Sequence, residues 1–309
     1  MTEYLKALKP IQHPELTGKK AEEPASPAVQ QMFHSLVMAV AYTLITRIDI
    51  CIYCVALQRV TTAPTNLHVR RLNALVRWAQ NNPLVLKYNR MKCGRRLRTY
   101  TDAGFKREEI EKEATLVTGR AVRGAVYIRM SEQPNQGHLI DWHCGSIKQV
   151  TRSTFTSEAL AAIAATDHSI MLAYTLEEIQ RGPRTPTQGL QRIMSPSDIS
   201  GVFKIEILLD AMSVLQALAQ ERIKAPCEKS FLIHLLWLRQ LIVDKLVLIG
   251  WTDTRDQYAD GLTKGSVSRE LLQEVAKGLC GNKHAITWIH DVKVKESPSD
   301  SAGNADPLV

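Results

Sequence analysis

Apolar residues in the first third of the chain recur at helical spacing. Ser26 followed by Pro27 is typical of a helix start, because serine caps a helix and proline suits its first position. The pattern predicts helices over residues 27–44, 49–60 and 65–82. The third of these has one apolar stripe at spacings of three and four, formed by Val69, Leu72, Val76 and Ala79.

Beyond residue 96, short apolar runs alternate with helical stretches. The predicted strands are 97–102, 121–130, 138–144, 202–210 and 245–251. The predicted helices are 154–179, 211–220, 227–243 and most of 256–277. The run VFKIEILLD (Val202–Asp210) becomes continuously apolar, as a strand buried on both faces does. Three strands followed by alternating helices and strands predict an α/β domain.

The chain divides into four segments by composition. Residues 1–26 are rich in Pro, Glu and Lys and are predicted to be a linker or disordered. Residues 27–96 form the helical segment, 97–285 the α/β domain, and 286–309 a disordered tail. The most apolar stretch, Leu36–Leu57, carries Arg47 and Asp49 at its centre. Two charges at a bilayer midplane cost about 2.5–3.5 kcal/mol each, so we expect no membrane association.

Four acidic residues lie on separate predicted elements of the α/β domain. Asp102 follows the first strand, Glu158 is one turn into the long helix, Asp210 ends a buried strand and Asp260 begins the last helix. Each of these acids alone is better explained as a helix cap or a surface charge. Their order along the chain is nevertheless one that an α/β fold brings together at one edge of the sheet.

A carboxylate at the end of a buried strand is costly without a compensating charge. Clustered carboxylates also repel one another, and a divalent cation reverses that effect by stabilising the ionised forms. Oxygen donors without thiolate or imidazole ligands suit Mg²⁺, with Mn²⁺ as a substitute. Two such ions about 4 Å apart can hold a scissile phosphate and activate a water molecule.

Charge is distributed unevenly along the chain. The formal net charge is +8, from 39 basic and 31 acidic residues, which favours a polyanionic partner. No Asp or Glu occurs from Cys51 to Thr101, a stretch with ten Lys and Arg residues. A solubilising surface would contain interspersed acids, so we predict contacts with nucleic-acid phosphates. We expect one exposed surface leading to the acids, formed by Arg70, Arg71, Arg77, Arg95, Arg96 and Arg98.

Four sequence words carry a resemblance to a known family. They are TYTDAGF (Thr99–Phe105), RSTFTSEALA (Arg152–Ala161), LLDAMSVL (Leu208–Leu215) and DQYADGLTKG (Asp256–Gly265). They resemble the ribonuclease H domain at the end of the Pol polyprotein of copia-type retrotransposons. Upstream, Phe33–Trp78 resembles the thumb-like helical part of reverse transcriptase in the same polyproteins. The resemblance covers about residues 30–285.

The resemblance implies a ribonuclease H-like, five-stranded mixed sheet flanked by helices and preceded by a small all-helical, thumb-like segment. It implies that Asp102, Glu158, Asp210 and Asp260 hold two Mg²⁺ ions and that the RNA strand of an RNA–DNA hybrid is cut. Asp102 matches the acid that bridges the two ions. Ala211 stands where the family usually has Asn, and residues 251–258 contain no His. Neither departure removes a metal ligand.

Polymerase activity is not expected, because no Asp-Asp dipeptide occurs in the chain. The chain is interpreted as a C-terminal fragment of such a polyprotein, with the polymerase part as a partner, in the cytoplasm, a virus-like particle or the nucleus. One alternative is a catalytically inactive, nucleic-acid-binding remnant. Another is a different nuclease of the same fold, such as an integrase or a resolvase.

Overall fold

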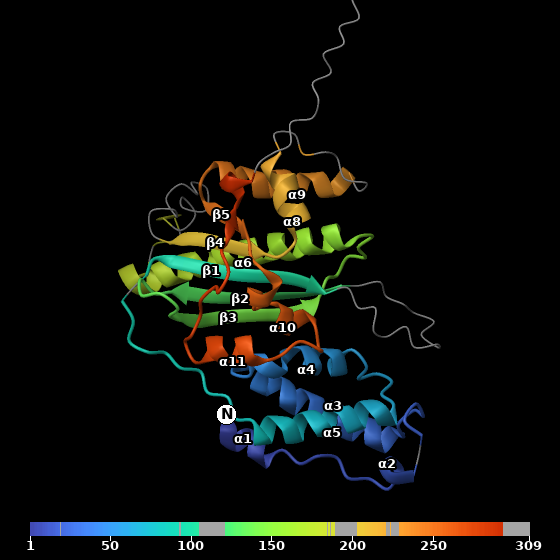
Figure 1. Cartoon of the computed structure of the whole chain (residues 1–309). Coiled ribbons are helices and arrows are strands. Elements are labelled where there is room, and N and C mark those ends of the chain that lie inside the picture. Colours follow the sequence, from blue (N-terminus) through green and yellow to red (C-terminus); the bar gives the residue numbers. More distant parts are fainter. Residues whose placement is uncertain are drawn as a thin grey trace, which may run out of the picture.

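The chain forms a helical unit and a mixed β-sheet unit that pack against each other (Figure 1). The structure is a computed structural model and describes residues 1–18, 20–92, 94–104, 121–183, 185, 187–188, 203–220, 223 and 229–292. Residues 83–92, which contain no helix or strand, lead from the helical unit toward the sheet unit.

The helical unit is built around the amphipathic helices that the sequence predicts. Its helices are α1 (Thr2–Ala7), α2 (Glu15–Gly18), α3 (Pro27–Tyr42), α4 (Cys51–Gln58) and α5 (Asn66–Asn81), with 3₁₀ turns η1 (Thr43–Ile45) and η2 (Ile48–Ile50) before α4. The predicted stripe of α5 is fully buried and packs against Phe33 and Val37 of α3. Thr65 and His68 form a capping box that fixes the start of α5.

The prediction that residues 1–26 are a linker or disordered is wrong. Leu5 and Ile11 are buried in the core of the helical unit. The buried side chain of Asn73 accepts a hydrogen bond from the Ile11 amide (2.7 Å) and donates one to the Ile11 carbonyl (2.8 Å). A few apolar anchors and one buried amide on α5 therefore hold a segment whose composition is mostly polar.

The described residues form six strands, which make one mixed sheet in the order β3-β2-β1-β4-β5-β6. Their bounds are β1 (Arg96–Gly104), β2 (Val122–Met130), β3 (Gly137–Ser146), β4 (Lys204–Leu209), β5 (Val247–Trp251) and β6 (Thr287–Trp288). The first three strands pair antiparallel, whereas β1, β4 and β5 run parallel. This arrangement confirms the predicted mixed sheet of the ribonuclease H-like class.

The predicted tail begins too early. We expected disorder from residue 286, but β6 pairs antiparallel with β5 and a 3₁₀ turn, η5 (Ile289–Asp291), follows it. Within the part of the chain that the structure describes, the sheet consequently has six strands, where five were expected. Residues 293–309 of the predicted tail lie outside the described part of the chain.

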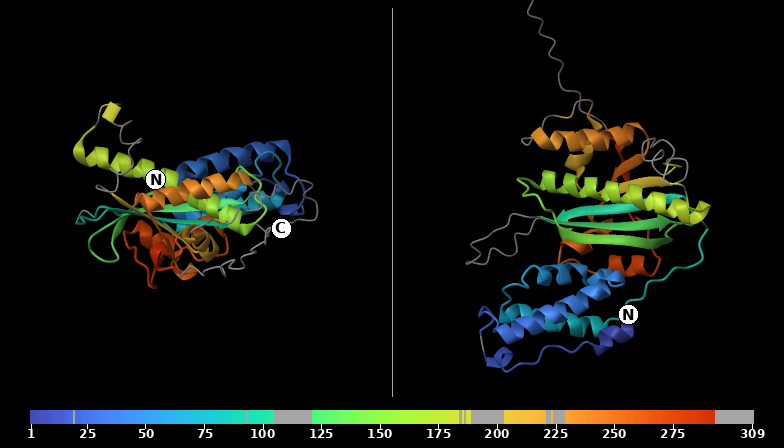
Figure 2. Two further views of the ribbon diagram at one scale, coloured as in Figure 1. Left: turned by 90° about the horizontal axis from the view of Figure 1, so that it is seen from above. Right: turned by 180° about the vertical axis from the view of Figure 1, so that it is seen from behind.

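Different helices cover the two faces of the sheet (Figure 2). On one face, α6 (Thr154–Arg181), α8 (Met212–Ala219) and α9 (Lys229–Val243) bury Ile205, Ile207 and Leu209 of β4. On the other face, α10 (Asp260–Thr263) and α11 (Glu270–Ala276) pack on Leu208, because side chains alternate along a strand. Gly265 and the turn after it interrupt the long helix predicted over 256–277.

The helical unit docks on the second face of the sheet unit. Ile48 of η2 and Cys51, the first residue of α4, share a core with Val126 of β2 and Leu262 of α10. Two helical segments, Pro27–Ile45 and Thr154–Arg181, are long and apolar enough to cross a membrane by length and composition alone. Both pack into the protein here, the first in the helical unit and the second on the sheet.

Candidate metal centre and active-site cleft

Three of the four predicted acids converge at one end of the sheet. Asp102 lies near the end of β1, and Asp210 directly follows β4. These parallel strands are neighbours, with Tyr100 paired to Leu208, so the acids two residues further on lie side by side. One carboxylate oxygen each from Asp102, Glu158 and Asp210 lies within 4.8 Å of the other two. In the sequence, about fifty residues separate each of these acids from the next.

The start of α6 directs Glu158 toward this point. Ser153 caps the helix, its hydroxyl accepting a hydrogen bond from the Thr156 amide (3.1 Å). Glu158 then lies one turn into the helix, and its Oε2 accepts a hydrogen bond from the Ala103 amide of β1 (3.1 Å). This bond ties the helix acid to the strand that carries Asp102.

Asp260 is adjacent to this group and is joined to it by a lysine. The Lys264 ammonium lies 2.7 Å from Asp260 Oδ1 and 3.4 Å from Asp102 Oδ1. Asp260 is the first residue of α10, so Lys264 stands one helical turn later on the same side. The four predicted acids are thus all at one location, three in direct proximity and the fourth linked through an ammonium group.

Burial and repulsion between carboxylates disfavour the ionised forms of Glu158, Asp210 and Asp260. Burial, followed by the charges of Asp102 and Asp210, raises the pKa of Glu158 to about 9. Burial and Asp102 likewise raise the pKa of Asp260 to about 7, and they raise the pKa of Asp210. Burial by itself would lower the pKa of Lys264, but Asp102 and Asp260 outweigh it and raise that pKa. The site therefore has an excess of negative charge that one ammonium does not balance.

Three groups around the acids were not predicted from the sequence. The Thr263 hydroxyl donates to Asp102 Oδ2, and the Thr254 hydroxyl donates to Asp210 Oδ2 (3.4 Å). Lys264 is the third. Both Thr263 and Lys264 belong to the DQYADGLTKG word, and the spacing of four from Asp260 to Lys264 on a helix was a usable signal. Thr254 had no comparable signal.

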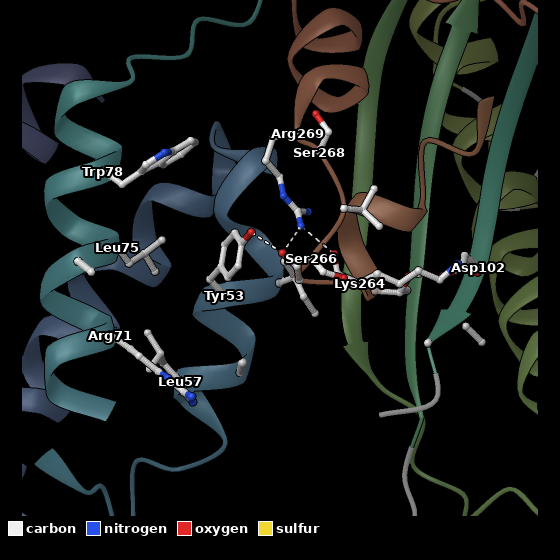
Figure 3. Close-up of a pocket in the computed structure, with 18 of the residues that line it drawn as sticks. Tyr53, Leu57, Arg71, Leu75, Trp78, Asp102, Lys264, Ser266, Ser268 and Arg269 are labelled. Atoms are coloured by element: carbon white, nitrogen blue, oxygen red, sulfur yellow. Dashed lines mark hydrogen bonds and ion pairs between the residues drawn. The ribbon is translucent and has the colours of Figure 1, made fainter. Parts of the chain in front are cut away.

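The acids open into a cleft of about 1130 Å³ between the two units (Figure 3). One wall comes from α4 and α5 and includes Tyr53, Arg71 and Trp78; the other includes Asp102 and the segment 263–269. The Tyr53 hydroxyl donates to the Gly265 carbonyl across the cleft (2.7 Å).

Arg269 reinforces this bridge across the cleft. Its guanidinium lies 5.0 Å from the centre of the Tyr53 ring and donates to the carbonyls of Lys264 (2.7 Å) and Gly265 (3.0 Å). The helical unit is therefore held against the segment that carries Lys264.

The six predicted nucleic-acid-binding arginines do not form one surface. Arg71 lines the cleft beside the acids, whereas Arg70 and Arg77 line a different groove beside residues 11–17. Arg95, Arg96 and Arg98 lie at the start of β1, at the opposite end of the strand from Asp102.

The expectation that Arg98 is exposed is wrong. Arg98 is buried and forms an ion pair with Glu206 of β4: its Nε donates a hydrogen bond to Glu206 Oε2 (2.9 Å), and its Nη2 lies 2.8 Å from the same oxygen. Glu206, the acid that pairs with Arg98, lies more than one hundred residues further along the chain. A count of the charges close to Arg98 in the sequence could not detect it. Arg96 lies 3.9 Å from the same carboxylate.

No protein-family model and no curated protein sequence matches the chain. Two solved structures are similar to it. One is the N-terminal RNase H domain of rv2228c from Mycobacterium tuberculosis, in a fusion with maltose-binding protein, at 16% identity and a TM-score of 0.34, covering 60% of this chain and 98% of that one. The other is RNase H1 from the halophilic archaeon Halobacterium salinarum NRC-1, at 16% identity and a TM-score of 0.33, covering 58% and 98%. The described strands form the mixed sheet that the sequence analysis predicts, with β1, β4 and β5 parallel and β1 to β3 antiparallel.

Proposed function

We propose that the chain is a metal-dependent endonuclease that hydrolyses the RNA strand of RNA–DNA hybrids. The observation that carries the proposal is the convergence of Asp102, Glu158 and Asp210 within 4.8 Å at the ends of β1 and β4. Asp260 adds a fourth buried carboxylate beside them. This is more negative charge than a structural role requires, and it suits the binding of hard cations.

The donor set fits Mg²⁺, with Mn²⁺ as a substitute, because every candidate ligand is a carboxylate oxygen. Asp102, Glu158 and Asp210 would hold one ion, and Asp102 with Asp260 would hold a second. Bound ions would stabilise the charge on the scissile phosphate and generate a nucleophilic water at neutral pH. The protein itself contributes the fixed positions: the Ala103 amide orients Glu158, and the hydroxyls of Thr254 and Thr263 orient Asp210 and Asp102.

The cleft supports a nucleic-acid substrate. It leads directly to the acids, and its opposite wall carries Arg71 and the indole of Trp78. An arginine can contact backbone phosphate and an aromatic ring can stack on a base, so both are suitable contacts for a strand in the cleft. Selection of RNA over DNA would depend on a contact to the 2′-hydroxyl.

We further propose that the chain derives from the C-terminal part of a copia-type Pol polyprotein. The support is the four sequence words, the thumb-like segment Phe33–Trp78 and the packing of that segment on the nuclease domain. The partner would be the polymerase part of the same polyprotein, and the location would be the cytoplasm, a virus-like particle or the nucleus.

One specific observation favours a second candidate, a catalytically inactive remnant that still binds nucleic acid. Ala211 replaces the Asn that usually follows the strand acid in the family, and this substitution removes one polar group beside Asp210. Cleavage assays separate the two candidates, because a remnant binds the hybrid without cutting it.

The proposed activity is tested with a hybrid labelled on the RNA strand, incubated with the full chain in Mg²⁺ or in EDTA. We expect cleavage of the RNA strand in Mg²⁺ only, with the labelled strands of duplex DNA intact. Binding without cleavage would support the inactive remnant. Equal cleavage of duplex DNA would favour an integrase-like or resolvase-like nuclease.

A further inference from the structure

Lys264 provides a positive charge inside the acid site. Its ammonium lies 2.7 Å from Asp260 Oδ1 and 3.4 Å from Asp102 Oδ1. Both aspartates are almost completely buried, at 4% and 1% exposure, whereas the lysine side chain is 36% exposed. The lysine therefore reaches from the cleft into a pair of carboxylates that solvent barely touches.

This contact divides the site into two unequal halves. In one half, Asp102, Glu158 and Asp210 converge, and the hydrogen bonds of the Lys264 ammonium go to neither Glu158 nor Asp210. In the other half, the ammonium lies between Asp102 and Asp260. Asp102 belongs to both halves, so any cation bound in one half shares a ligand residue with the cation in the other.

We infer that the Lys264 ammonium takes the place of the second metal ion, so that this ion binds only when the lysine leaves. The inference rests on the proposed metal-dependent function. A divalent ion and an ammonium cannot share the same carboxylate oxygens, because like charges at that separation repel strongly. The first ion thus binds to Asp102, Glu158 and Asp210 alone, and the second binds more weakly in exchange for the lysine.

The lysine has a route out of the site. Lys264 lines the active-site cleft, and its flexible four-carbon stem lets the ammonium move without movement of the backbone. The backbone around it is fixed, because Arg269 donates to the Lys264 carbonyl (2.7 Å) and the Tyr53 hydroxyl donates to the next carbonyl (2.7 Å). Exchange of the ion for the lysine therefore requires only a side-chain rotation.

Calorimetric titration of the full chain with Mn²⁺ tests the inference. We expect two binding events, the second weaker than the first by about tenfold or more, the ratio that corresponds to about 1.4 kcal/mol. In Lys264→Met, which removes the charge and keeps a similar length, the second event should tighten by about tenfold while the first changes little. Lys277→Met, at an exposed lysine after α11, is the matched control and should titrate like the parent protein.

Two further measurements distinguish the loss of the Lys264 charge from general disruption of the fold. Lys264→Arg keeps a cation beside Asp102 and Asp260, so the weaker second event should persist. In EDTA, the melting temperature of Lys264→Met should fall below that of the parent, because two buried carboxylates lose their cation, and Mn²⁺ should raise it by more than it raises the parent value. A circular dichroism spectrum that matches the parent establishes that the variant is folded.

The inference is overturned if folded Lys264→Met and the parent protein show the same two affinities. If the parent nevertheless cuts hybrids in Mg²⁺, the proposed function stands and only the role of Lys264 is lost. If the parent binds no Mn²⁺, the metal centre is wrong, and both the inference and the proposed function fail.

Discussion

Both ends of β1 and β4 carry buried charged side chains, but opposite charges balance each other at one end only. At the start of the strands, Arg98 is paired with Glu206 in the sheet register, and their side chains form an ion pair with one hydrogen bond. Four residues later, Asp102 and Asp210 occupy the corresponding positions, and Glu158 and Asp260 add further negative charge. Tyr100 and Leu208 form an apolar layer between the two clusters. The first cluster is balanced within the fold, and the second is not.

This difference separates a structural charge pair from a candidate functional site. In a buried ion pair the two charges neutralise each other, so the pair needs no ion from solution. An unbalanced acid cluster raises the pKa of its members and is stabilised by a cation from outside. The following predictions test whether the two ends behave in these two ways.

The largest effect is expected for Asp210→Asn. Loss of one carboxylate from Asp102, Glu158 and Asp210 should lower cleavage of an RNA–DNA hybrid by at least about a hundredfold, since metal ions contribute several kcal/mol to such reactions. The free energy of unfolding in EDTA should stay equal or rise, because one like charge is removed. A gel assay and urea unfolding measure the two quantities. Cleavage at the parent rate would exclude Asp210 from the site.

Glu206→Gln should have the opposite effects on the two quantities, with stability lowered and cleavage retained. It leaves the buried guanidinium of Arg98 without its carboxylate, so the free energy of unfolding should fall by about 3–5 kcal/mol in urea titrations. Cleavage by the folded fraction should be retained. The double variant Arg98→Met with Glu206→Leu should recover most of the lost stability, because no buried charge is left unpaired. A stable Glu206→Gln protein with lost cleavage would reverse the roles assigned to the two ends.

The acid cluster should make stability depend on pH and on Mg²⁺. The pKa values of Glu158 and Asp260 are raised to about 9 and about 7, above the ordinary values of 4.5 and 3.8 for these side chains. The unfolded chain therefore releases these protons first, and without metal the melting temperature should fall as the pH rises from about 4 to about 9.

Mg²⁺ binds the ionised carboxylates, so it should raise the melting temperature more at pH 8 than at pH 6. We expect a difference between the two pH values of about 3 °C or more, equivalent to about 1 kcal/mol. Thermal unfolding followed by circular dichroism measures it. The Asp210→Asn variant should show a smaller Mg²⁺ effect, and an equal effect in both proteins would place the bound Mg²⁺ elsewhere.

The smallest effect concerns the basic residues. Arg71→Ala should weaken hybrid binding a few-fold and reduce the slope of log affinity against log salt by about 0.9, the value for one phosphate contact. Arg70→Ala with Arg77→Ala should leave both quantities unchanged, since these residues line the other groove. Fluorescence anisotropy at several salt concentrations distinguishes the two. A flattened slope in the double variant would restore the original expectation that Arg70 and Arg77 contact nucleic acid.

Strand periodicity predicted β1 to β5, and the acids at the ends of two of these strands, Asp102 and Asp210, predicted the place of the acid cluster. Val202–Asp210 could be read as a buried strand ending in a carboxylate, and parallel neighbours bring such ends together. The apolar stripe of α5 was equally clear, because helical spacing depends on residues close in sequence.

The features that were missed depend on contacts between distant residues. The partner of Arg98 is Glu206, and the partner of Ile11 is Asn73; neither pair has a local signature. β6 has only two residues and exists because β5 offers a free edge at Gly250 and Trp251. Lys264 could have been identified from its spacing to Asp260, but its contact with Asp102 required the fold.

The most direct test of the metal centre is an anomalous difference map from a crystal of the full chain soaked in Mn²⁺. We predict a peak bonded by oxygens of Asp102, Glu158 and Asp210 at about 2.0–2.2 Å, the distance expected for such an octahedral ion, and none beside Arg98 and Glu206. A map with no peak at the three acids, or with their carboxylates about 10 Å apart, would contradict the claim that this end of the sheet binds metal.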